Sequence, residues 1–312
     1  MLKKTVLGLC AALMMSAPAH AAEKVTVLLD WFINPDHAPI MVAEQIGAFK
    51  EAGLDVEIVP PADPSMPPRL VAAGQADLAI TYQPQIYLLA DKDLPVVRVA
   101  TLVDTPLNTL TVLKKSGIKS LADLKGKKIG YSVSGVEDAT IAAMLQTAGL
   151  SLSDVELVNV NFQLVTALMS GQVDAVIGGY RNFEATELKE QGADAVMFNV
   201  EDYSPTYDEL ILVANKANAN DPKIAKFLAA LQKGTDYLLA HPDETWTAFA
   251  KAHPDLDNNL NRTAWKDTLP AFARNVYTLD TPRYEAYGKF LADHKLISAE
   301  KPVSDYAVEL KK

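Results

Sequence analysis

Two tyrosines that end matching stretches of the chain are the first residues whose spacing suggests chemistry. Residues 78–82 and 175–180 are short apolar runs. Each run directly follows an aspartate, and three positions before that aspartate stands a glycine that ends a helical segment. Continuous apolar runs are typical of buried parallel strands, and open parallel sheets bind ligands beyond the carboxyl ends of their strands. The repeat therefore predicts two similar α/β lobes that present Tyr82 and Tyr180 to a shared cleft with a planar or apolar guest.

The residues that follow the second tyrosine add polar candidates. Glu184 lies one helical turn beyond Tyr180 on the same face, where its carboxylate could accept from an exocyclic amine or a protonated ring nitrogen, or could simply be solvated. Arg181 could oppose an anionic substituent or pair with Glu184, and both readings stay open. Gly178 and Gly179 allow the backbone to approach a guest closely, because no Cβ intervenes.

Two further groups of candidates follow other expected strands. Trp31 offers a flat face, and Asn34 can donate and accept hydrogen bonds, which suits the edge of a heterocycle. The alternative is a core tryptophan and a turn asparagine. Ser134 and Gly135 precede an expected helix over 137–148, whose free N–H groups suit an anion or a carbonyl oxygen. Two acidic residues at its start favour a neutral oxygen over a phosphate.

Length and charge limit the classes of partner. A chain of 312 residues is about right for two domains with real cores, and nearly half of its residues are hydrophobic. The formal charge of −10 argues against nucleic acid and against anionic membranes as partners. We expect a monomer that binds a small molecule.

The first residues have the pattern of a secretory signal peptide. Lys3 and Lys4 precede an apolar run over 6–15, and residues 19–21 (AHA) form a cleavage signal. The run is too short to span a bilayer. Cys10, the sole cysteine, lies inside this segment, so cleavage after residue 21 would leave no disulfide and no thiolate site. This combination predicts an exported protein of a bacterial periplasm.

The remaining strand and helix signals divide the mature chain into two lobes. We expect the first lobe to comprise residues 22–107 and 215–312, and the second to comprise residues 108–214. A strand over 209–214 would carry the chain back, and a helical tail would pack on the outside of the first lobe. Two crossings between lobes make a hinge, which suits ligand-driven closure.

Sequence motifs of enzymes are lacking. The chain contains no GxSxG, no P-loop, no HExxH and no GxGxxG after a strand. The four histidines beyond the signal segment are too scattered to suggest a set of metal ligands, although His37 could form an acid–base pair with Asp36. We therefore expect no catalytic residue, no metal and no cofactor.

Several of these residues resemble a known family. The chain closely resembles the ThiY-like proteins in residues 29–40 (LDWFINPDHAPI), 48–49 (AF), 52–54 (AGL) and 178–180 (GGY) together with Glu184. These proteins belong to the NMT1/THI5-like group of periplasmic binding proteins, whose relatives carry sulfonates, nitrate and riboflavin. The resemblance implies a type II periplasmic binding fold that serves an ABC importer through its inner-membrane permease. It implies a formylaminopyrimidine, salvaged for thiamine synthesis, as the ligand.

The resemblance also implies roles for individual residues. It assigns pyrimidine contacts to four of them, with Trp31 lining the pocket: Asn34, Tyr82, Tyr180 and Glu184. The departure is Arg181, where ThiY-like sequences tend to have a tryptophan. That change leaves a related pyrimidine or another small heteroaromatic compound open as the ligand.

Two alternative functions follow from the same residues. One is a binding protein for an anion, such as a sulfonate or an aromatic carboxylate, with Arg181 and the amides of Ser134 and Gly135 as the receptor. The other is an enzyme, because the group includes a eukaryotic pyrimidine synthase of similar fold. That enzyme depends on a cysteine-rich motif and on a lysine that holds pyridoxal phosphate, and the mature chain lacks cysteine.

Overall fold

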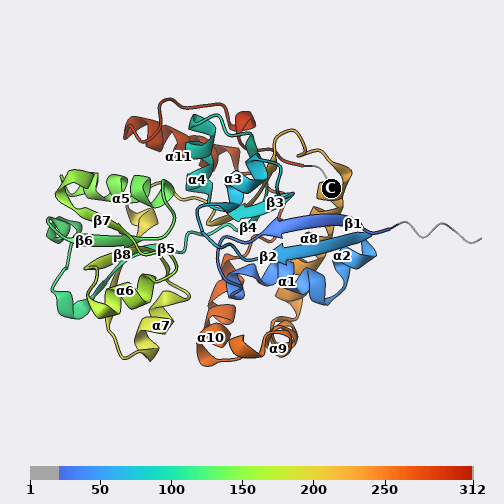
Figure 1. Cartoon of the computed structure of the whole chain (residues 1–312), viewed down its shortest axis with the longest axis horizontal. Helices are drawn as coiled ribbons and strands as arrows, with labels where there is room; N and C mark the ends of the chain where they lie inside the picture. The colour runs from blue at the N-terminus through green and yellow to red at the C-terminus, as the bar shows by residue number, and fades with distance from the viewer. Residues whose placement is uncertain (1–20, 311–312) are drawn as a thin grey trace, which may run out of the picture.

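The computed structural model describes residues 21–310 and shows two lobes side by side, each built on a five-stranded sheet (Figure 1). Except for Ala21, the predicted signal peptide lies outside the described residues. Among the described residues, no helix has the length and apolar character needed to cross a membrane.

The first sheet has the strand order β2-β1-β3-β10-β4. Strands β1, β2 and β3 run parallel, whereas β10 runs antiparallel to β3 and β4. Since β10 is buried between two strands of this sheet, the predicted boundary between 214 and 215 cuts through a strand of the first lobe and moves to before residue 210. The strands are β1 (Glu23–Leu28), β2 (Leu54–Val59), β3 (Leu78–Thr81), β4 (Val96–Val103) and β10 (Leu210–Asn215).

The second sheet repeats this arrangement in the order β7-β6-β8-β5-β9. Here β5 is the antiparallel strand, paired with β8 and β9. In both sheets the antiparallel strand is the one that arrives from the other lobe. It starts at the edge where the parallel strands end, so its first residues also face the cleft. The strands are β5 (Asn108–Leu113), β6 (Lys128–Tyr131), β7 (Glu156–Asn159), β8 (Ala175–Tyr180) and β9 (Ala195–Asn199).

Helices cover both faces of the first sheet (Figure 1). Gly47, with φ of +74°, separates two short helices that follow β1 in the chain. Helices α1, α2, α8 and α9 pack on one another beside one face, and α3, α4 and α11 lie on the other. They span α1 (Ala38–Gln45), α2 (Ala48–Glu51), α3 (Pro67–Ala72), α4 (Gln83–Asp91), α8 (Pro222–Ala240), α9 (Pro242–Ala252) and α11 (Thr281–Asp293).

The helical tail packs on the first lobe as expected, but it also reaches the second. Helix α10 (Asn259–Thr268) contacts both the short 3-10 helix η1 (Pro35–His37) of the first lobe and α7 (Glu184–Glu190) of the second. The other main helices of the second lobe are α5 (Val136–Thr147) and α6 (Leu164–Ser170). The tail therefore bridges the lobes opposite the hinge.

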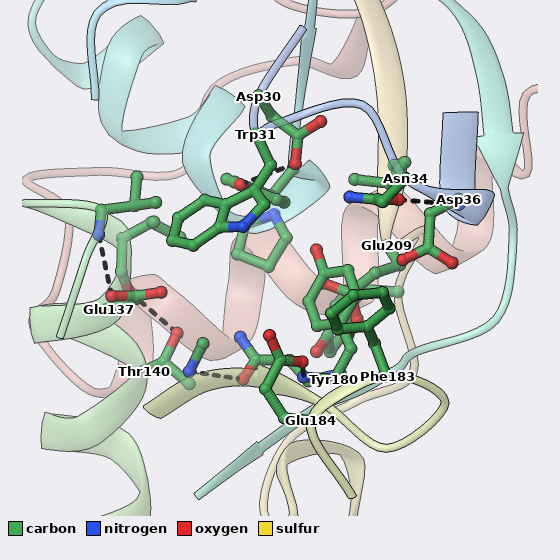
Figure 2. Close-up of a pocket in the computed structure, with 18 of the residues that line it drawn as sticks. Asp30, Trp31, Asn34, Asp36, Glu137, Thr140, Tyr180, Phe183, Glu184 and Glu209 are labelled. Carbon is green, nitrogen blue, oxygen red and sulfur yellow. Dashed lines mark hydrogen bonds between the residues drawn. The ribbon is translucent and has the colours of Figure 1, made fainter. Parts of the chain in front are cut away.

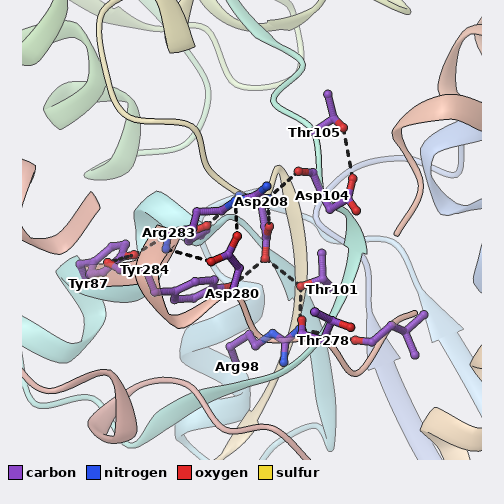
Figure 3. A network of polar contacts seen from close by, with 12 residues as sticks. Tyr87, Arg98, Thr101, Asp104, Thr105, Asp208, Thr278, Asp280, Arg283 and Tyr284 are labelled. Carbon is purple, nitrogen blue, oxygen red and sulfur yellow. Dashed lines mark hydrogen bonds and ion pairs between the residues drawn. The ribbon is translucent and has the colours of Figure 1, made fainter. Parts of the chain in front are cut away.

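One arginine of the tail supports both crossings between the lobes (Figure 3). Arg283 donates from Nη1 to the backbone oxygen of Asp104, in the first crossing, at 2.7 Å. The same nitrogen lies 2.5 Å from Oδ1 of the buried Asp208, in the second crossing. Thr101 and Tyr284 donate to the other oxygen of Asp208 at 2.8 and 3.1 Å. The start of α11 thereby holds the two hinge segments together.

Close packing of α8 on α1 depends on Gly234. A Cβ added there would lie 2.6 Å from both Cβ and N of Ala43, which leaves no room for a methyl group. We expect Gly234→Ala to lower the free energy of unfolding by about 1–3 kcal/mol, because the two helices must move apart. Urea unfolding measures this loss. The neighbouring Lys233→Ala, which removes an exposed ion pair with Glu51, should cost less than about 1 kcal/mol; equal losses would contradict the steric argument.

Candidate functional site

A pocket lies between the two lobes, at the edges of the two sheets where their parallel strands end (Figure 2). It contains about 720 Å³ of empty space, part of which is open to solvent. No lysine or arginine of the described residues lines it. Its walls combine five aromatic rings (Trp31, Tyr82, Tyr180, Phe183, Tyr207) with five carboxyl groups (Asp30, Asp36, Glu137, Glu184, Glu209).

Five of the eight candidate residues from the sequence line this pocket. Trp31 and Asn34 follow β1, Tyr82 follows β3, and Tyr180 ends β8. Glu184 begins α7 and accepts the N–H of Tyr180 at 2.6 Å. The repeated strands thus bring the two tyrosines to one cavity.

The two tyrosines have different hydrogen-bond partners. Tyr82 donates its hydroxyl to Oδ2 of Asp30 at 2.9 Å. The hydroxyl of Tyr180 is buried and makes no hydrogen bond of ordinary geometry with the described residues, although it lies close enough to Glu209 to lower the pKa of that carboxyl. Burial raises the pKa of both phenols well above 10, so both remain neutral donors.

Asn34 has a structural task as well as a place in the pocket. Its Oδ1 accepts the N–H of Asp36 at 2.8 Å and so caps η1, and its Nδ2 donates to the backbone oxygen of Phe32 at 3.1 Å. The turn reading of this residue is therefore correct. A side-chain amide has two N–H groups, so one donor remains for a guest.

Three candidates lie outside the pocket, contrary to the sequence prediction. Ser134 is exposed and donates its N–H to Ser65, at 3.1 Å. Gly135 donates its N–H to Asp138, also at 3.1 Å, so a carboxylate of the protein already satisfies this helix start. Arg181 neither faces a guest nor pairs with Glu184.

The guanidinium of Arg181 pairs instead with Glu201. Its Nη2 lies 2.5 Å from Oε1 of that residue, and its Nε donates to the backbone oxygen of Leu107. These contacts direct the cation toward the crossing segment between the lobes, away from the pocket. The departure from the family pattern at this position therefore leaves the pocket lining without a cation.

Glu137 occupies the place where the sequence suggested an anion or a carbonyl oxygen. Its Oε2 accepts the N–H groups of Ser132 and Val133 at 2.6 and 2.9 Å. Desolvation raises the pKa of Glu137 to about 8. A Cβ at Gly178 would lie only 2.1 Å from Oε1, so this glycine makes room for the carboxyl group rather than for a guest.

Glu209 is a pocket residue that was not predicted from the sequence, because only residues at the ends of parallel strands were expected at the cleft. It precedes the antiparallel strand β10, and therefore reaches the cleft from a strand's start. Its Oε2 accepts the N–H groups of Leu107 and Asn108 at 2.5 and 2.9 Å. Burial raises its pKa to about 7, and it raises the pKa of the half-buried Glu184 to about 8. The feature of the sequence that could have identified Glu209 is an acidic residue directly before a buried apolar strand.

A second polar cluster joins the lobes beside the pocket. Asn182 of the second lobe donates from Nδ2 to Oδ1 of Asp36 at 2.6 Å and to Oγ1 of Thr268 at 2.7 Å. Desolvation raises the pKa of Asp36. His37 does not pair with its neighbour Asp36: its Nε2 lies 2.9 Å from Oδ1 of Asp30, and its Nδ1 accepts the N–H of Asn34.

Most of the pocket lining lies in a region of the chain that matches a known protein family. A family model described as NMT1/THI5 like matches residues 34–245, which include most of the pocket lining. The chain belongs to the NMT1/THI5-like family. Among the described residues, no group of three or more histidine, aspartate or glutamate side chains is arranged to hold a metal ion.

Relatives of this chain carry three kinds of name. A protein of Haemophilus influenzae named for thiamine biosynthesis is 51% identical over 96% of each chain. A formylaminopyrimidine-binding protein of Halalkalibacterium halodurans is 41% identical, over 72% of this chain and 69% of its own. A 4-amino-5-hydroxymethyl-2-methylpyrimidine phosphate synthase of Saccharomyces cerevisiae is 32% identical, over 87% of this chain and 84% of its own.

Solved structures establish the fold. The alkanesulfonate-binding protein of Xanthomonas axonopodis, bound to MOPS, matches with a TM-score of 0.73 at 17% identity, over 92% of this chain and 99% of its own. The periplasmic nitrate-binding protein of Synechocystis matches with a TM-score of 0.69 at 13% identity, over 92% and 86%. The fold is that of type II periplasmic binding proteins, as the resemblance implied.

Buried glutamates should make the ligand-free protein less stable as the pH rises. The folded pKa values of Glu137 and Glu209, about 8 and 7, exceed the ordinary value of 4.5, so the folded state binds more protons than the unfolded state above pH 4.5. The free energy of unfolding should therefore fall between pH 4.5 and 8, by up to about 1.4 kcal/mol per pH unit and group. Urea unfolding at several pH values measures the slope. The double variant Glu137→Gln/Glu209→Gln should reduce this slope, with Glu184 still contributing to it, and Glu51→Gln on the surface should leave it unchanged.

Asn182 should stabilise the contact between the lobes. Asn182→Ala removes two buried hydrogen bonds and leaves Asp36 with one donor fewer, so we expect a loss of about 1–3 kcal/mol in unfolding free energy. The matched control is Asn259→Ala, since Asn259 also joins α10 to the second lobe, through an exposed bond to Glu190. That change should cost less than about 0.5 kcal/mol. Equal losses in the two variants would show that burial of the first contact does not matter.

Proposed function

We propose that this protein is a solute-binding protein that encloses an aminopyrimidine of the thiamine-precursor class between its lobes. One observation carries the proposal: the pocket combines five aromatic rings with five carboxyl groups and has no lysine or arginine in its described lining. The name of the formylaminopyrimidine-binding relative, at 41% identity, supports the same class of ligand.

The chemistry of an aminopyrimidine matches these walls. Its flat ring can stack on aromatic side chains, each pair contributing roughly 0.5–1.5 kcal/mol beyond area burial. Its exocyclic amine offers N–H donors, and its ring nitrogen can take a proton. A carboxylate has about four acceptor sites, and the backbone uses only one or two of those on Glu137 and Glu184. A charge-assisted bond to either would contribute roughly 1.5–3 kcal/mol.

The groups that were expected to bind an anion do not line the pocket. Arg181 pairs with Glu201, and the helix start at Ser134 and Gly135 lies outside the pocket. An anionic guest would enter a cavity whose only lining residue able to become a cation is His37, which is bonded to Asp30. A buried anion without a cation to pair with is unfavourable in a desolvated site. We therefore favour a neutral or basic ligand.

The enzyme alternative rests on the yeast synthase relatives. In the synthase a lysine holds pyridoxal phosphate, as the resemblance implies, and a cysteine-rich motif takes part. The described residues place no lysine in the pocket, and the one cysteine of the chain, Cys10, lies outside them. We propose binding without chemistry, with export to the periplasm through residues 1–21 and delivery to an ABC permease by a monomer.

Ligand binding tests the proposal directly. Protein that has been unfolded and refolded to remove any bound solute is titrated calorimetrically with formylaminopyrimidine, hydroxymethylpyrimidine, an alkanesulfonate and benzoate. We expect binding of the pyrimidines alone. Glu184→Gln keeps a donor and an acceptor but cannot accept a proton, so affinity should fall by about 10- to 100-fold, matching roughly 1.5–3 kcal/mol.

The matched control is Glu187→Gln, on the same helix but outside the pocket lining, which should change affinity less than threefold. Binding of the sulfonate or of benzoate in place of the pyrimidines would refute the proposal. Turnover of a pyrimidine by the purified protein with pyridoxal phosphate would establish the enzyme instead.

A further inference from the structure

A second cavity adjoins the pocket on the outer side of Trp31. The lining of this outer cavity is mainly aliphatic and neutral polar, and it also includes the rings of Phe32 and Phe162 and the carboxyl group of Glu187. It shares four lining residues with the pocket, which are therefore the partition between the two spaces: Trp31, Asn34, Phe183 and Glu184.

The indole of Trp31 is held in this partition from the opposite lobe. Phe162, in the loop between β7 and α6, packs its ring edge-to-face against the indole, with centroids 4.6 Å apart. The ring of Phe32 lies 4.4 Å from that of Phe162 on the solvent side and is 52% exposed. Aromatic pairs favour this edge-to-face geometry. The contact between Trp31 and Phe162 exists only while the lobes are together, since each comes from a different lobe.

Phe162 itself lines the outer cavity and not the pocket, so it can act on a guest only through Trp31. We propose that Phe162 is a positioning residue that limits the length of the ligand, by holding Trp31 as a wall between the pocket and the outer cavity. The inference rests on the proposed aminopyrimidine function. A pyrimidine with a short substituent fits inside the wall, and a pyrimidine that carries a second ring does not.

The chemistry of the outer cavity defines the compounds that the wall excludes. Glu187 faces that space together with the aromatic rings, a combination that attracts flat organic cations. A pyrimidine joined to a cationic ring, as in thiamine, would place its pyrimidine in the pocket and its second ring in the outer cavity if the wall were absent. The intact wall therefore selects precursors against the finished two-ring product, by steric exclusion rather than by charge.

Relative affinities for one-ring and two-ring ligands test the wall. Calorimetric titrations with hydroxymethylpyrimidine and with thiamine are made on the unaltered protein, on Phe162→Ala and on Phe32→Ala. We expect the unaltered protein to prefer the one-ring compound, and Phe162→Ala to reduce that preference at least tenfold. Phe32 also packs against the indole, but with centroids 6.2 Å apart, so Phe32→Ala should reduce the preference by less than Phe162→Ala does. An unchanged preference in Phe162→Ala would overturn the proposal, and if that variant does not fold, Phe162→Leu replaces it.

A measurement without ligand separates this proposal from the proposed function. Of the three tryptophans, Trp246 and Trp265 are buried, so quenching of fluorescence by acrylamide reports mainly on Trp31. Phe162→Ala should increase quenching if the ring holds the indole in place, and Phe32→Ala should do so less. If the unaltered protein binds neither compound, the proposed function fails while quenching still decides whether Phe162 positions Trp31. Equal quenching in all three proteins would show that it does not.

Discussion

The carboxyl group of Glu209 joins the two places where the chain crosses between the lobes. It accepts the N–H groups of Leu107, at the end of the first crossing, and of Asn108, at the start of β5, while its own backbone belongs to the second crossing. It also lines the pocket. The hinge and the site therefore share one desolvated acid. A guest that donated to this carboxyl group would therefore act directly on one of the contacts between the two crossings.

The buried carboxyl groups of the pocket limit the type of ligand that can bind there. Burial disfavours their charged forms, and backbone N–H groups only partly offset this for Glu137, Glu184 and Glu209. Acids with raised pKa values in one cavity are typical of functional sites. A ligand with N–H donors or a positive charge would replace the hydrogen bonds that water makes to an exposed carboxyl group. Relatives named as binding proteins and as synthases both match this chain over most of its length, so the side chains that line the site, and not membership of the family, decide the function.

Much of the architecture follows from local sequence. The repeat of a glycine, an aspartate and an apolar run ending in tyrosine predicted the two lobes, and the comparisons confirm the fold. Local patterns could not show that each sheet contains an antiparallel strand, because strand direction is set by long-range pairing. Two consequences were therefore missed: the first residues of β10 belong to the first lobe, and Glu209 reaches the cleft.

The sequence by itself determined which residues follow the parallel strands, and it thereby placed Trp31, Tyr82, Tyr180 and Glu184 at one cavity. Only the tertiary structure decided the partners of the charged groups. Arg181 turns to Glu201, twenty positions away in the chain, and Glu137 fills the helix start that seemed free for a guest. The physical reason is that a charged group pairs with a partner that lies within a few ångströms in the folded protein. The separation of two residues along the chain does not determine that distance in space.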